Sequence, residues 1–308
     1  MAETTIRFEE ADLRIYLLGL PRAECLGGVL AVPRRQVRAL LFRLAARLQP
    51  VSRQHLCFLF WPDLPESTAR RNLSRLLPQL RSALRVPQVL VIADDQVWLD
   101  PAHVWSDTAT FERLCAEREP QRQIDAFAQA IDLYRGPFLD AFSLPGSPEF
   151  ESWVSLEREG WQQLYLKLLA FLVEKHVARE DYAAAITYAR RYLETDDLAE
   201  DIHRRLIELY AAVGDRSAAL RQYKRCVATL ERELKVSPLP ETQAMLQAVL
   251  EGRSPWKEPA LPAPSPAEGS LSKEPALSLS KGAGSQGIGP ARGTFRCRTP
   301  FETRCRSA

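Results

Sequence analysis

The fold of this chain is decided by the stretch Glu66-Ser-Thr-Ala-Arg-Arg-Asn-Leu-Ser-Arg-Leu-Leu-Pro-Gln-Leu-Arg-Ser-Ala-Leu-Arg85. Five leucines recur in it at helical spacing and share one narrow face: Leu73, Leu76, Leu77, Leu80 and Leu84. Arg71, Arg75 and Ser82 fall roughly opposite this face. The pattern predicts a helix that docks its leucines on a small core and lays its arginines in a DNA groove. An ordinary surface helix with a solvated charge run fits the same pattern, so the flanking sequence has to decide.

Two more helices are predicted upstream. Arg34 to Leu48 is strongly amphipathic, and Pro50-Val51-Ser52 then interrupts it, with Ser52 suited to N-cap a second helix whose apolar body is 55–60. Trp61-Pro62 ends that helix, because the residue before proline is pushed out of the helical region. We expect Asp63 or Leu64 to cap the third helix, with Pro65 in its first turn.

Short strand patterns flank these helices on both sides. Residues 13–18 form one candidate strand, and Gly27-Gly28 followed by 29–32 forms a short hairpin candidate. After the helices, 89–92 and 97–99 flank the polar turn 93–96, which predicts a β-hairpin. Strands, three helices and then a hairpin is the order of a winged helix-turn-helix with an N-terminal sheet, which we assign to residues 12–105.

Residues 106–252 are almost wholly helical by pattern and contain a repeat. Residues 181–186 realign on 215–220 at an offset of 34 residues, with the small side chains of Ala185 and Ala219 at equivalent places. This helix-turn-helix period is typical of tetratricopeptide repeats, whose helix pairs must stack on neighbours to bury their faces. Helices are also expected at 123–134, at 149–176 and, as a cap, at 240–251; a generic helical bundle is the alternative. Residues 253–308, rich in proline and glycine, are expected to be a disordered low-complexity tail.

The patterns together predict a mainly α chain with a small β component, and the sequence contains little that would support enzymatic chemistry. The net charge is +2, but residues 1–105 carry 14 Arg against 10 acids, while residues 106–255 carry 19 basic residues against 25 acids. The basic first region suits attraction to phosphates. The sequence has no nucleotide-binding, metalloprotease or nucleophile-elbow motif, so we expect no catalysis, no metal and no cofactor. Scattered cysteines, and the lack of a long apolar run or a signal peptide, favour a cytoplasmic protein away from the membrane.

The chain resembles bacterial transcriptional activator domain regulators of the Streptomyces antibiotic regulatory protein type over about residues 12–252. The segments that carry the resemblance are Leu56-Cys-Phe-Leu-Phe-Trp61-Pro-Asp63, Ala69-Arg-Arg-Asn72-Leu, Leu133-Tyr134-Arg-Gly136-Pro-Phe138-Leu139, Pro148-Glu149-Phe-Glu-Ser-Trp153 with Glu157-Arg158, and Leu234-Lys-Val-Ser-Pro238-Leu-Pro240-Glu241-Thr242. The resemblance implies a winged helix joined to a tetratricopeptide-like domain, and a sequence-specific activator that binds double-stranded DNA and contacts RNA polymerase. The chain departs from the family pattern at Pro78, inside the third helix, and at the acidic wing tip Asp94-Asp95.

Two groups of residues are therefore candidates for function. Arg71 and Arg75 are expected at the DNA interface, with Arg70, Asn72 and Ser74 as lesser candidates. The loop before the third helix offers Asp63 and Glu66 for polymerase contact, unless these acids serve to cap the helix. Because one winged helix reads only a short site, we expect a homodimer on repeated half-sites.

The alternative is a helical-repeat interaction module with degenerate DNA binding. The chain can also be a truncated piece of a larger ATPase regulator.

Overall fold

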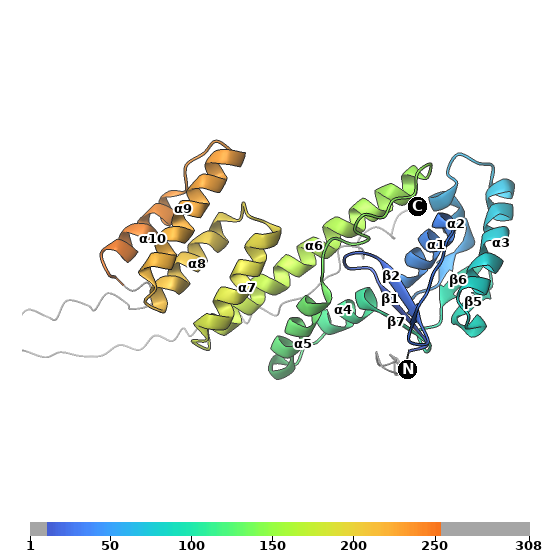
Figure 1. Cartoon of the computed structure of the whole chain (residues 1–308), viewed down its shortest axis with the longest axis horizontal. Helices are drawn as coiled ribbons and strands as arrows, with labels where there is room; N and C mark the ends of the chain where they lie inside the picture. Colours follow the sequence, from blue (N-terminus) through green and yellow to red (C-terminus); the bar gives the residue numbers. More distant parts are fainter. Residues whose placement is uncertain (1–10, 254–308) are drawn as a thin grey trace, which may run out of the picture.

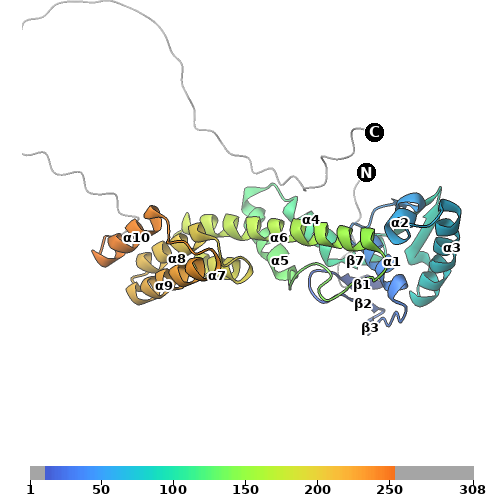
Figure 2. The same cartoon turned by 90° about the horizontal axis from the view of Figure 1, so that it is seen from above.

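The computed structural model describes residues 11–253. The chain forms an elongated molecule, with a mixed α/β unit at one end and a row of helices at the other (Figures 1 and 2). The 30-residue helix α6 (Pro148–Val177) joins the two. The predicted fold class, a winged helix-turn-helix followed by a tetratricopeptide-like domain, is confirmed over this range. The expected disordered tail at 254–308 lies outside the described residues.

Two small sheets frame the first unit. The four-stranded sheet has the order β3-β2-β1-β7 and the three-stranded sheet the order β4-β6-β5. Their strands are β1 (Leu13–Tyr16), β2 (Arg22–Cys25), β3 (Gly28–Val29), β4 (Val51–Ser52), β5 (Leu90–Ala93), β6 (Gln96–Leu99) and β7 (Val104–Ser106). The hairpin β5–β6 is the predicted wing, and Asp94 and Asp95 form its turn at φ 47° and 65°. Periodicity did not predict that β7 pairs in parallel with β1, or that β4 adds a third strand to the wing.

The first unit also contains three helices: α1 (Arg35–Ala45), α2 (Arg53–Phe60) and α3 (Glu66–Ala83). The hydroxyl of Ser52 accepts a hydrogen bond from the amide of His55 at 3.1 Å, which confirms the predicted cap of α2. The third helix begins differently from the prediction. Pro65 occupies its N-cap position, and the Pro65 carbonyl accepts the amides of Thr68 and Ala69. Neither Asp63 nor Leu64 caps α3, because the loop turns one residue later than expected.

Pro78 does not interrupt α3. The helix runs through it to Ala83 and bears Pro78 on an exposed face. Proline removes one amide donor, so the carbonyl one turn earlier loses its intrahelical partner. On an exposed face this carbonyl can be solvated, which lets the helix remain continuous.

The first unit also has a short 3₁₀ turn at Pro87–Val89, just before β5. The second region consists of α4 (Asp107–Cys115), α5 (Pro120–Leu133), α6, α7 (Tyr182–Thr195), α8 (Glu200–Ala212), α9 (Arg216–Glu233) and α10 (Pro240–Leu250). The 34-residue repeat is visible in the helix starts. The carboxylate of Asp181 accepts the amide of Ala184 at 3.2 Å, and Asp215 accepts that of Ala218 at 2.8 Å. Ala185 and Ala219 are fully buried, as close approach of neighbouring helices requires.

The hydrophobic core does not divide at residue 105. One core cluster runs from Leu13 to Leu172 and joins the winged helix to α4, α5 and most of α6. A second cluster, from Val173 to Val249, holds α7 to α10 together. Phe42 of α1 contacts Phe142 edge to face, and Phe60 of α2 packs on Phe150 of α6. The winged helix therefore shares its core with the first helices of the second region.

Two motifs of the family resemblance lie at this junction. Segment 135–140 returns to the end of β1, where the amide of Leu139 donates to the carbonyl of Leu17 at 2.8 Å. Gly19, at φ +120°, allows the close approach of the two segments. Arg158 of α6 donates to the carbonyls of Phe138 and Leu139 at 2.8 and 2.7 Å. These residues build the joint between the two units.

Candidate nucleic-acid interface

Helix α3 has the two faces that its sequence predicts. The leucine face is buried, with exposed fractions from 0% to 5%, at Leu73, Leu76, Leu77, Leu80 and Leu84. The opposite face carries exposed side chains at Arg71, Ser74 and Arg75. Anchoring by five leucines leaves the helix free to present its arginines to a partner without disturbing the core.

Arg71 and Arg75 lie one helical turn apart and face no carboxylate. The guanidinium of Arg71 donates to the hydroxyl of Thr68 at 3.1 Å. Arg75 makes no side-chain hydrogen bond or ion pair within residues 11–253. Both charges are therefore available to an external anion, and binding one would not first require breaking an internal salt bridge.

Arg70 is held differently from its neighbour. Its guanidinium bonds Glu66 at 2.9 Å, one turn earlier on α3, and Asp95 at the wing tip at 2.9 Å. Hydrogen bonds to Glu66, and then to Asp95, raise the pKa of Arg70. The acidic wing tip is thus partly neutralised from inside the domain, and Arg70 fixes the wing against the helix.

Arg53, at the start of α2, is a residue that sequence reasoning missed. Its guanidinium donates to the hydroxyl of Ser74 at 2.8 Å and lies 3.9 Å from the carboxylate of Asp95. Ser74 is therefore already hydrogen-bonded to Arg53. Arg53 adds a positive charge beside Arg71 and Arg75 of α3. Its place directly after the capping Ser52 is the signal that could have found it, because the N-terminus of a helix is a common anion site.

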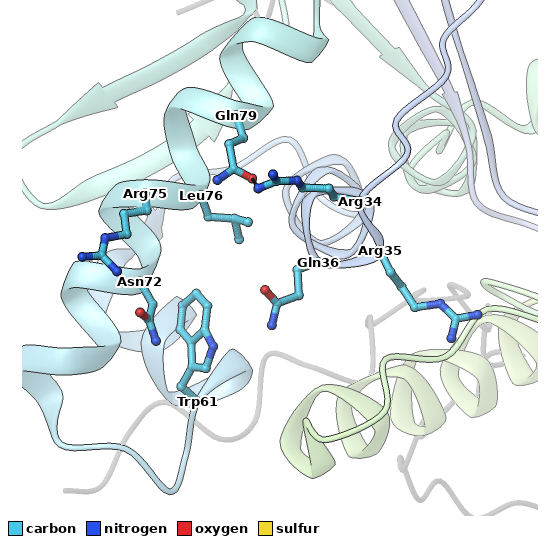
Figure 3. A pocket seen from close by; sticks show the side chains of 8 residues that line it. All are labelled: Arg34, Arg35, Gln36, Trp61, Asn72, Arg75, Leu76 and Gln79. Carbon is cyan, nitrogen blue, oxygen red and sulfur yellow. Dashed lines mark hydrogen bonds between the residues drawn. The ribbon is translucent and has the colours of Figure 1, made fainter.

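A groove of about 590 Å³ runs between α3, the start of α1 and the end of α2 (Figure 3). Its lining residues are Arg34, Arg35, Gln36, Trp61, Asn72, Arg75, Leu76 and Gln79. Arg34 donates to the amide oxygen of Gln79 at 2.7 Å and so bridges α1 and α3. The half-buried Asn72 faces this groove rather than the outer face of α3, while Arg75 borders both. No carboxylate lines the groove, which extends the basic surface.

The loop between α2 and α3 is exposed from Asp63 to Pro65. Asp63 is exposed and makes no hydrogen bond or ion pair within the described range, and Leu64 beside it is 41% exposed. A turn from the carbonyl of Trp61 to the amide of Leu64 at 3.3 Å shapes the loop. Glu66 is already paired with Arg70. The two acids predicted for this loop are therefore not equivalent.

The described residues contain no cluster of three or more side chains that could hold a metal ion. Four cysteines, Cys25, Cys57, Cys115 and Cys226, are buried free thiols. None of the helices in residues 11–253 has the length and apolar character needed to span a bilayer.

Comparison with known proteins agrees with this architecture. No curated protein sequence matches the chain significantly. The structure of EmbR from Mycobacterium tuberculosis in complex with a low-affinity phosphopeptide superposes with a TM-score of 0.57 at 22% identity, over 79% of this chain and 66% of EmbR. This chain thus spans about two thirds of the EmbR length. Residues 103–250 match the model of the bacterial transcriptional activator domain. Over residues 103–250, just under half of its length, the chain is therefore similar to the bacterial transcriptional activator domain family.

Proposed function

We propose that this protein is a DNA-binding transcriptional activator that reads DNA with the outer face of α3. The observation that carries the proposal is the pair Arg71 and Arg75, exposed one turn apart, with no carboxylate partner, on a helix anchored by buried leucines. Arginine donates two hydrogen bonds to the O6 and N7 atoms of guanine in the major groove, which a helix of this width can enter.

The other candidates have supporting roles in this proposal. Arg70 positions the wing through Asp95, and Arg53 holds Ser74, so both shape the surface before DNA arrives. Asn72 borders the groove beside Trp61 and can contact a base or phosphate from its edge. The pairing of Asp95 also lowers the repulsion that an acidic wing would exert on phosphates. This favours DNA binding over a degenerate winged helix that serves only as a scaffold.

The decisive experiment is a gel shift with the full chain on DNA from upstream of its own gene, repeated over a salt titration. We expect Arg71→Ala or Arg75→Ala to cost about 1–3 kcal/mol of specific binding where that residue reads a guanine. A residue that contacts phosphate would instead weaken all sequences alike and reduce the salt slope by about one. Arg122→Ala on α5, 74% exposed, is the matched control. Wild-type binding by both α3 variants would refute the assignment.

We further propose that the segment 61–67 contacts RNA polymerase, the partner that the family resemblance implies. Asp63 supports this role, because it is exposed and does not cap α3, which removes the structural alternative. Glu66 is a weaker candidate since Arg70 already holds its carboxylate. Asp63→Ala should abolish activation in a reconstituted transcription assay while DNA binding stays intact. Loss of DNA binding in the same variant would contradict the proposal.

The helical region 106–252 is proposed to support cooperative binding of a homodimer to repeated half-sites. A single winged helix discriminates poorly among the many near matches in a genome, and a second bound copy raises affinity through effective concentration. The full chain should bind a two-half-site DNA with a steeper isotherm than a single half-site. Equal steepness on both DNAs would refute a cooperative dimer.

A further inference from the structure

The row of repeat helices contains a groove of its own, far along the molecule from α3 (Figure 1). It measures about 320 Å³ and lies between α7, α8 and α9. Leu193, Leu206 and Ala218 contribute apolar surface to it and are themselves at most 7% exposed. The floor of the groove is therefore formed by the hydrophobic cluster that holds α7 to α10 together. The groove opens between the helices of the two 34-residue repeats.

Three arginines surround this apolar floor. Arg190 comes from α7, while Arg221 and Arg225 lie one turn apart on α9. All three are exposed, and Glu194 is the single carboxylate among the lining residues. The excess of positive charge contrasts with the region around it, in which residues 106–255 carry 25 acids against 19 basic residues.

The polar side chains of the groove are held in place by the helices behind them. Arg190 donates from Nε to the hydroxyl of Tyr210 at 2.7 Å, which orients its guanidinium. Gln222, 8% exposed, bonds Nδ1 of His203 at 2.6 Å, and His203 Nε2 donates to the carbonyl of Asp197 at 3.0 Å. Burial lowers the pKa of His203, so the ring is neutral near pH 7 and accepts from Gln222. Arg221 and Arg225 make no side-chain hydrogen bond or ion pair within the described residues.

We propose that this groove binds an acidic peptide segment of a partner protein, with carboxylates on the arginines and one apolar side chain on the floor. Arginine pairs with carboxylates in a two-pronged geometry, and the exposed pair Arg221 and Arg225 has the charge for it. A groove of this volume accommodates side chains but not a DNA duplex. Stacked helix pairs offer such surfaces for protein segments. The proposal does not depend on DNA recognition by α3.

The test measures fluorescence anisotropy of a labelled peptide, Glu-Leu-Glu-Glu-Leu-Glu, against the full chain. We expect saturable binding that the glutamine-for-glutamate version of the peptide lacks. The double variant Arg221→Ala with Arg225→Ala should weaken binding at least about tenfold, since each substitution removes hydrogen bonds between a guanidinium and a carboxylate. Lys224→Ala, an exposed cation on the same helix that does not line the groove, is the matched control and should bind like wild type.

Three results would overturn the proposal. Wild-type affinity in the double variant would show that the groove is not the site, and an equal loss in Lys224→Ala would show unspecific charge attraction. If glutarate displaced the peptide at equal carboxylate concentration, the groove would be a site for small carboxylate anions and not for a peptide. A matching loss of DNA affinity in the double variant, with its thermal unfolding unchanged, would assign the arginines to phosphates instead. Retained DNA binding separates this test from that of the proposed function.

Discussion

Asp107 accepts hydrogen bonds from the backbone amide of Leu17 at 2.9 and 2.8 Å, although the two residues lie 90 positions apart in the chain. The same carboxylate accepts the amides of Leu18 at 2.9 Å and of Thr108 at 2.8 Å. Asp107 is the first residue of α4 and is 2% exposed. One buried side chain thus ties the start of the helical region to the end of β1 in the winged helix.

Asp107→Ala should destabilise the whole first core. The substitution leaves three backbone amides without their acceptor, and a buried donor left unsatisfied costs about 1–3 kcal/mol. We expect a total loss of about 2–4 kcal/mol in the free energy of unfolding, since some amides can gain water. Urea denaturation measures it, with Asp125→Ala on the exposed face of α5 as control. Equal stability of the two variants would show that the amides are satisfied in another way.

The same carboxylate makes stability depend on pH. Burial raises the pKa of Asp107 to about 6, and the hydrogen bonds from Leu18, Leu17 and Thr108 offset only part of this effect. A raised pKa in the folded state means that this group stabilises the fold most below about pH 4 and loses that contribution as pH rises to about 6. Asp107→Asn cannot ionise, so the stability difference from wild type should change by about 2 kcal/mol between pH 4 and pH 7. A constant difference over that range would contradict the shift.

Glu157 is the second buried link between the units. Its carboxylate, on a residue 4% exposed, binds Arg47 in the turn after α1 at 2.8 Å and accepts from the indole nitrogens of Trp153 and Trp161 at 3.1 and 2.9 Å. Glu157→Ala should cost about 2–4 kcal/mol, because it removes the acceptor of two indole N–H groups and leaves Arg47 with Glu112, at 3.1 Å, as its remaining carboxylate. Glu157→Gln keeps the acceptor and should cost less.

Chemical denaturation gives both values for Glu157. Glu159→Ala, exposed two residues later on α6, is expected to be neutral. If Glu157→Ala and Glu159→Ala changed the free energy of unfolding equally, Glu157 would not stabilise the junction between the two units.

Asp95→Asn should strengthen DNA binding. Asparagine tolerates the positive φ of the wing turn, while the change removes the charge that pairs with Arg70 and repels phosphates. We expect an affinity gain of about three- to tenfold at low salt that shrinks as salt rises. Asp94→Asn removes one charge from the same turn without freeing Arg70, and should gain less. Reduced affinity in Asp95→Asn would mean that the wing must be held by this pair to bind DNA.

A fragment that ends at Trp105 should not unfold cooperatively. It lacks Asp107 and the aromatic rings that cover Phe42 and Phe60, so part of the core that runs to Leu172 is exposed to water. A fragment through Thr195 retains α6 and α7 and should give a single transition. Calorimetry distinguishes the two. A sharp transition in the shorter fragment would show that the winged helix folds by itself.

Local patterns determined the elements of this protein. The leucine spacing in α3, the cap at Ser52 and the 34-residue repeat all follow from interactions within a few residues of one another, and the structure confirms them. The exposure of Arg71 and Arg75 was predictable for the same reason, because a helix puts residues opposite a buried face in solvent. Their contact with DNA stays a prediction.

The tertiary structure decided which distant residues meet. Arg70 pairs with Asp95 across 25 positions, Asp107 with Leu17 across 90, and Arg47 with Glu157 across 110. No periodicity encodes such pairs, since they depend on how the sheets and helices pack against one another. The same packing joined the winged helix to α4–α6 in one core and placed Asn72 in a groove rather than on the outer face of α3. The sequence by itself determined the helices and strands, because they depend on interactions between residues close together in the chain. The contacts that join the two units depend on residues far apart in the chain, so only the tertiary structure decided them.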